Sequence, residues 1–110
     1  MAGSGSSVLD RLYRTIESRK GADPAASYTA QLIAAGRGRI ARKLGEEGVE
    51  AALACAAGER GALVAESADV IYHLLVAWAE AGIAPAEVWA ELERREGTSG
   101  IEEKRSRSKR

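Results

Sequence analysis

The chain has 110 residues with 16 basic and 16 acidic side chains, so its formal net charge is zero. This length predicts one small domain with a limited core of its own. The single cysteine, Cys55, excludes an internal disulfide, fits a reducing cytosol and is expected to be a small buried hydrophobe. We expect no apolar run of the roughly 18 residues that span a bilayer and no signal peptide, and therefore a soluble, cytoplasmic protein without a membrane partner.

The composition predicts an all-α fold. Alanine is abundant, phenylalanine is absent, and prolines occur only at positions 24 and 85. No period-two alternation of β-branched residues indicates a strand. We expect a helical bundle of four to five helices, completed by dimerisation because its wide apolar stripe exceeds what a monomer conceals. The predicted helices cover about residues 8–20, 27–35, 39–57, 59–81 and 84–96, with Ser7 and Ser27 as N-caps of the first two.

The flanking segments differ from this body in composition. Residues 1–6 read as a flexible Gly/Ser leader, residues 7–97 as the domain, and residues 98–110 as a basic, flexible arm. From Arg94 onward there are seven basic and three acidic residues, so the tail is basic and the body acidic. Such an arm could attract any polyanion, or close over a phosphorylated substrate. We expect no nucleic-acid partner.

Five acidic residues on two consecutive helices form the main candidate site. On helical geometry, Glu46, Glu47 and Glu50 lie within an arc of about 100°, and Glu66 and Asp69 lie about 60° apart on the next helix. Like charges this close destabilise a helix unless a cation lies between them. Mg²⁺ prefers carboxylate oxygens and commonly shares its remaining ligand positions with substrate phosphates. The alternative is a pair of solvated acidic faces.

Basic residues and one histidine lie close to these acidic residues in the sequence. Four basic residues directly precede the acidic ones: Arg37, Arg39, Arg42 and Lys43. They form either a basic surface turn or a set of ligands for phosphate oxygens. Lys43 is the strongest candidate for binding phosphate, followed by Arg39 and Arg42. His73 projects between the directions of Glu66 and Asp69 and is a candidate substrate contact, although a lone histidine is more often structural.

Several stretches resemble a known family. The pattern Glu47-x-x-Glu50, fifteen residues, then Glu66-x-x-Asp69 resembles the four-carboxylate signature of the all-helical, MazG-like nucleoside-triphosphate pyrophosphatases. The flanking words resemble those of the phosphoribosyl-ATP pyrophosphohydrolases, enzymes of histidine biosynthesis, over roughly residues 8–107. These words are Ser27-Tyr28-Thr29, Lys43-Leu44-Gly45-Glu46-Glu47, Glu66-Ser67-Ala68-Asp69-Val70-Ile71-Tyr72-His73 and Gly97-Thr98-Ser99-Gly100-Ile101-Glu102-Glu103-Lys104.

The resemblance implies Mg²⁺-dependent hydrolysis of phosphoribosyl-ATP to phosphoribosyl-AMP and pyrophosphate. It implies Glu47, Glu50, Glu66 and Asp69 as metal ligands, with Glu46 as an added ligand or the base that orients water. A covalent intermediate is not needed, since no Ser-His-Asp or Cys-His arrangement is apparent. Two other interpretations remain open: a housekeeping pyrophosphatase of noncanonical nucleoside triphosphates, and a noncatalytic helical dimer that binds a polyanion through its basic tail.

Overall fold

The computed structural model describes residues 4–108, which form six α-helices and no strand. The predicted all-α class is confirmed, with one helix more than the four to five expected. The helices are α1 (Ser4–Ser18), α2 (Tyr28–Ala35), α3 (Arg37–Ala57), α4 (Arg60–Ala81), α5 (Pro85–Arg95) and α6 (Gly100–Ser108).

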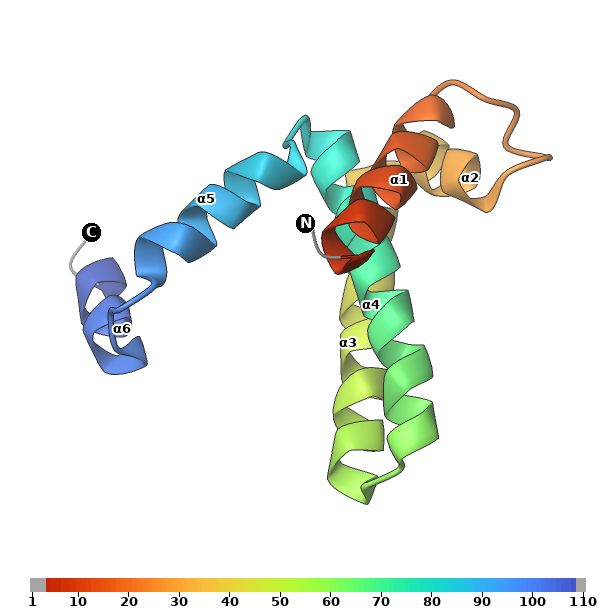
Figure 1. The fold of residues 1–110 in the computed structure, drawn as a ribbon. Helices are drawn as coiled ribbons and strands as arrows, with labels where there is room; N and C mark the ends of the chain where they lie inside the picture. The colour runs from red at the N-terminus through yellow and green to blue at the C-terminus, as the bar shows by residue number, and fades with distance from the viewer. Residues whose placement is uncertain (1–3, 109–110) are drawn as a thin grey trace.

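Helices α3 and α4 form a long antiparallel hairpin around which the other elements are arranged (Figure 1). Helices α1 and α2 pack against one end of this hairpin, and its other end extends beyond them (Figure 1). Helix α5 leaves the end of α4 and projects away from the body, and α6 turns back at its tip (Figure 1). The described part of the chain is therefore an open shape.

The helix boundaries follow local backbone chemistry. Ser27 caps α2 as predicted, because its hydroxyl oxygen accepts a hydrogen bond of 3.1 Å from the Ala30 N–H. Gly36 has φ of 98° between α2 and α3, and Gly58 and Gly82 end α3 and α4 in the left-handed conformation. A side chain strains that conformation, so glycine separates these helices cleanly.

The core lies where α1 and α2 meet the hairpin. Its members, all at most 2% exposed, are Ile16, Leu32, Ile40, Leu75, Val76 and Ala79. Tyr13 ties α1 to the turn after α4 by donating a 2.7 Å hydrogen bond to the Ile83 carbonyl. Burial is the main cause that raises the Tyr13 pKa to about 12. Trp78 and Trp89 meet edge to face, with ring centroids 5.9 Å apart, so both pack α5 against α4.

Two terminal segments differ from the sequence-based expectation. Helix α1 begins at Ser4 rather than after a cap at Ser7, so it includes part of the predicted leader; residues 1–3 lie outside the described residues. Helix α6 occupies residues expected to form a flexible arm. A capping box explains its start: Ser99 Oγ accepts from the Glu102 N–H at 3.1 Å, and the Glu102 carboxylate accepts from the Ser99 N–H at 3.2 Å.

Two further expectations need correction. Helix α4 is long and apolar enough, by length and composition alone, to cross a membrane, although no such run was expected. It is instead the central core helix, which supplies Leu75, Val76 and Ala79 and also carries acidic residues. Cys55 is an exposed, free thiol rather than a buried hydrophobe, because α1 and α2 leave its part of α3 uncovered.

Candidate active site

Three of the five predicted carboxylates converge between α3 and α4. One oxygen each from Glu47, Glu66 and Asp69 lie within 4.8 Å of one another. Glu47 and Glu66 are partly buried, and Asp69 is exposed. The antiparallel hairpin produces this arrangement, because it brings the middle of α3 beside the first half of α4.

Glu66 carries the clearest sign of an unmet electrostatic requirement. Its Oε1 is buried and has no hydrogen-bond partner among the residues that the structure describes. Desolvation, followed by the charges of Glu50, Asp69 and Glu47, raises the pKa of the Glu66 carboxyl. A buried carboxylate oxygen without a donor is costly, and a cation would stabilise it.

The two remaining predicted acids lie at the rim. Glu46 faces Lys43, whose Nζ is 3.2 Å from Glu46 and 3.8 Å from Glu47. The hydrogen bond to Glu46 is the first cause that raises the pKa of Lys43, and nearby Tyr28 is the second. Glu50 is exposed but close enough to Glu66 to affect the Glu66 pKa. Lys43 thus supplies the cluster with one positive charge.

His73 is buried rather than open to a ligand. It is 5% exposed, and its Nδ1 donates to the Asp69 carbonyl oxygen at 2.8 Å. Its Nε2 lies 3.3 Å from the Tyr28 hydroxyl, from which the neutral ring accepts. Beside it, Thr29 hydrogen-bonds Tyr72. These contacts fasten α2 to α4 one turn from Asp69, so the structure supports a positioning role for His73.

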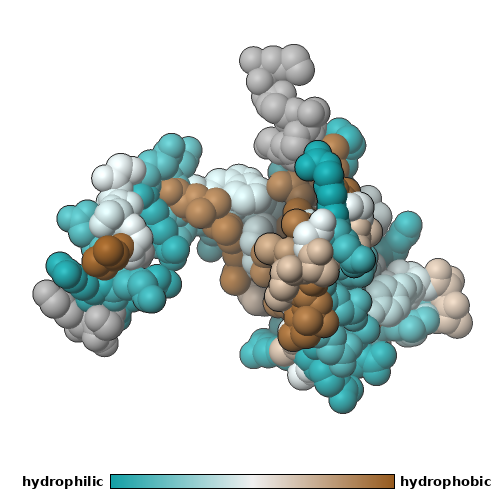
Figure 2. All heavy atoms as spheres, turned by 90° about the horizontal axis from the view of Figure 1, so that it is seen from below, coloured by the Kyte–Doolittle hydropathy of each residue, from teal (hydrophilic) through white to brown (hydrophobic). Residues whose placement is uncertain are grey.

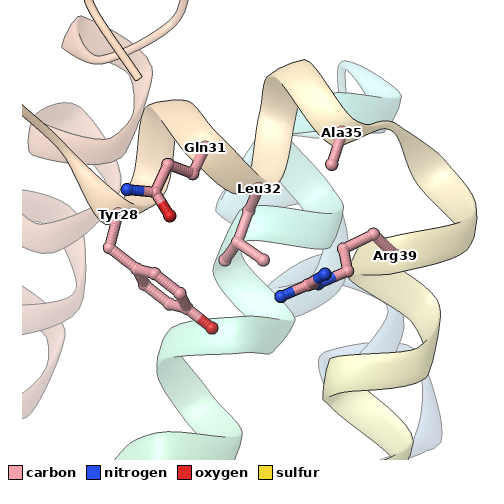
Figure 3. Close-up of a pocket in the computed structure, with 5 residues that line it drawn as sticks. All are labelled: Tyr28, Gln31, Leu32, Ala35 and Arg39. Atoms are coloured by element: carbon pink, nitrogen blue, oxygen red, sulfur yellow. The ribbon is translucent and has the colours of Figure 1, made fainter. Parts of the chain in front are cut away.

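The basic residues before the cluster separate into three environments. Arg37 is ion-paired at 3.1 Å with Glu80, which is not one of the five predicted carboxylates. Arg42 is exposed. Arg39 lines a pocket of about 220 Å³ whose other walls are Tyr28, Gln31, Leu32 and Ala35, from α2 (Figure 3). The sequence pattern did not identify Tyr28 or Gln31 as site residues; the only signal was the family-like stretch Ser27-Tyr28-Thr29.

This donor set fits a hard divalent cation. All the converging ligands are carboxylate oxygens, with no histidine nitrogen or cysteine sulfur among the described groups. Such ligands suit Mg²⁺, Mn²⁺ or Ca²⁺ better than soft metals. Glu66, which has the unpartnered oxygen, is also a member of this converging group. The arrangement is thus an acidic cluster that could hold a metal ion, with a pocket lined by Arg39 on the N-terminal side of α3.

Comparisons with known proteins agree with this chemistry. Residues 9–96 match the family model described as phosphoribosyl-ATP pyrophosphohydrolase. A protein named phosphoribosyl-ATP pyrophosphatase from Paramagnetospirillum magneticum is 60% identical over 104 residues, covering 94% of this chain and 95% of that protein. Proteins of the same name from Dinoroseobacter shibae and Azospirillum brasilense are 58% and 56% identical, covering 92% and 91% of this chain and 99% and 90% of their own lengths. The chain therefore belongs to the phosphoribosyl-ATP pyrophosphohydrolase family.

Proposed function

We propose that this chain hydrolyses the α–β phosphoanhydride of phosphoribosyl-ATP, a step of histidine biosynthesis, in the cytoplasm. Water adds across that bond and the products are phosphoribosyl-AMP and pyrophosphate. The observation that carries the proposal is the convergence of Glu47, Glu66 and Asp69 in a chain of this family. The same family membership favours this reaction over general nucleotide clearance and over a noncatalytic dimer.

Four carboxylates would hold the metal: Glu47, Glu66 and Asp69 from the converging set, and Glu50 from the rim. We assign Mg²⁺, which would neutralise the charge that accumulates on the phosphate oxygens during in-line attack. Glu46 serves as an added ligand or, with Glu47, as the carboxylate that orients the attacking water and accepts its proton.

Lys43 would have one set of partners without the metal and another with it. In the metal-free protein it neutralises part of the cluster through Glu46 and Glu47. With a divalent cation held by the carboxylates, the Lys43 ammonium group would be available to a phosphate oxygen of the substrate. Arg39 and Arg42, which lie on the same helix, would bind other phosphate groups of the substrate.

The direct test is release of pyrophosphate from phosphoribosyl-ATP with and without Mg²⁺. We expect turnover only with the metal, and loss of turnover in Glu50→Gln with the helical circular-dichroism spectrum unchanged. A panel of free nucleoside triphosphates provides the comparison. Faster hydrolysis of the free nucleotides than of phosphoribosyl-ATP would contradict the proposed substrate.

We also propose that the enzyme is a homodimer. A wholly apolar groove lies between α1, α4 and α5, and Figure 2 shows hydrophobic surface running from the projecting arm onto the body. Its lining residues are Leu9, Ile71, Leu74, Leu75, Trp78, Val88, Trp89 and Leu92. The radius of gyration is 15.9 Å, against about 13 Å for a compact domain of this length. A second copy would cover the groove and complete the bundle.

A further inference from the structure

The pocket beside the acidic cluster has a donor set of its own. Figure 3 shows the Arg39 guanidinium and the Tyr28 hydroxyl pointing toward one another, with Leu32 between them and the Gln31 amide next to Tyr28. We propose that this pocket recognises the phosphoribosyl group on the purine, with Arg39 binding its 5′-phosphate. The inference rests on the proposed function and names Arg39 as a specificity-determining residue for it.

Arg39 differs from Arg37 and Lys43 in having no ion-pair partner among the described residues. Arg37 is held by Glu80, and Lys43 is held by Glu46 and Glu47. Arg39 makes no hydrogen bond or ion pair with any side chain that the structure describes, yet it lines a pocket. A guanidinium fork without a partner matches a phosphate monoester, to which it donates two parallel hydrogen bonds.

The position of Arg39 in α3 adds to the attraction for an anion. It is the third residue of this helix, whose first backbone hydrogen bond is donated by Ile40 to Gly36. The free N–H groups of the first turn give this end a partial positive charge. The Gln31 amide supplies a further donor from α2.

Tyr28 forms a fixed wall between the pocket and the acidic cluster. Its side chain is 45% exposed, yet its hydroxyl is held by His73, which is itself held by the Asp69 carbonyl. That hydroxyl lies 3.3 Å from His73 Nε2, and the Tyr28 ring is one of the walls of the pocket. A flat aromatic face at this point suits the purine, which connects the triphosphate to the ribosyl group.

The distance between Arg39 and the acidic cluster along α3 favours a phosphate, rather than the base, as the group that Arg39 binds. Arg39 precedes Glu47 by eight residues, which is about 12 Å along the helix axis. With the α–β bond at the acidic cluster, the purine comes first and the 5′-phosphate of the added ribosyl group lies beyond it. We place the purine side of the substrate toward the N-terminus of α3, so that the remote phosphate lies at Arg39; in this orientation free ATP has no phosphate there.

Steady-state kinetics of Arg39→Ala test the inference, with phosphoribosyl-ATP as substrate and ATP and ribose 5-phosphate as inhibitors. Loss of one charge-assisted contact should raise KM for phosphoribosyl-ATP about 10- to 100-fold. We expect little change in kcat, an inhibition constant for ATP within about twofold of wild type, and loss of inhibition by ribose 5-phosphate. Arg39→Lys should recover part of the affinity, since it keeps the charge but not the fork.

Arg60→Ala is the matched control, because Arg60 is also an exposed arginine in the first turn of a long helix but lies at the other end of the hairpin. It should leave all constants unchanged. Equal weakening of ATP and phosphoribosyl-ATP by Arg39→Ala would overturn the inference, as would an unchanged KM. If the wild type fails to hydrolyse phosphoribosyl-ATP, the proposed function fails, whereas calorimetric titration with ribose 5-phosphate still decides the role of the pocket.

Discussion

Replacing Asp69 by asparagine should change activity and metal-free stability in opposite directions. The substitution removes one charge from the group in which the carboxylate oxygens of Glu47, Glu66 and Asp69 lie within 4.8 Å. It keeps the size of the side chain and leaves the Asp69 carbonyl to accept from His73. Asp69 is exposed, and at that distance a water-like dielectric gives a repulsion of about 1 kcal/mol between Glu47 and Asp69.

Relief of that repulsion should raise the melting temperature of the metal-free protein by about 4 °C for a domain of this size. Glu66 adds repulsion of the same sign. With Mg²⁺ the wild type should have the higher melting temperature, because a ligand at 100 times its dissociation constant stabilises the native state by about 2.7 kcal/mol. Asp69→Asn should lose that stabilisation and its turnover.

Thermal unfolding followed by circular dichroism, in EDTA and across a Mg²⁺ titration, measures both effects. Glu93→Gln is the control, because Glu93 is exposed on α5, far along the chain from the cluster. This substitution should change neither the melting temperature in EDTA nor the rise in melting temperature that Mg²⁺ causes. A lower melting temperature for Asp69→Asn in EDTA, together with a full Mg²⁺ shift, would refute the electrostatic reasoning.

Three further changes have defined outcomes. Gly36→Ala should destabilise the fold by about 1 kcal/mol or more in urea unfolding, because φ of 98° strains an L side chain; an unchanged midpoint would count against this. Hydrogen bonds from Arg94 and Arg95 lower the Glu91 pKa to about 2, so their stabilisation is present above the ordinary glutamate pKa of about 4.5 and lost as pH falls through about 2. Glu91→Gln should therefore lower the melting temperature slightly at pH 6 but not at pH 2; a difference that persists at pH 2 would contradict the assignment. Leu92→Arg places a charge in the apolar groove and should convert the proposed dimer to a monomer, as measured by light scattering; an unaltered dimer mass would contradict an interface at this groove.

The interior helices were predictable because the residues that start and end them act locally. Ser27, Gly58 and Gly82 act through their own backbone and side-chain geometry, so α2, α3 and α4 begin or end within two residues of the predicted positions. Helix α6 was missed because its basic composition was given more weight than the Ser99–Glu102 capping box, which is also visible in the sequence. The capping signal for α6 was present in the sequence, but the segment has no apolar face that would indicate a packed helix.

The acidic cluster was predictable in composition but not in detail. Helical spacing placed all five carboxylates on two neighbouring faces, yet it could not show that Glu46 turns to Lys43 or that one Glu66 oxygen is buried. Those features depend on how α3 packs against α4. The pocket at Arg39 depends likewise on the angle between α2 and α3 at Gly36, which spacing does not encode.

The central claim is that carboxylates from α3 and α4 hold a divalent cation. A crystal soaked in Mn²⁺, which substitutes for Mg²⁺ at oxygen-rich sites, provides the most direct measurement through its anomalous difference map. We expect a peak coordinated by oxygens of Glu47, Glu66 and Asp69. No peak there, or a peak bound only by other residues, would contradict the account.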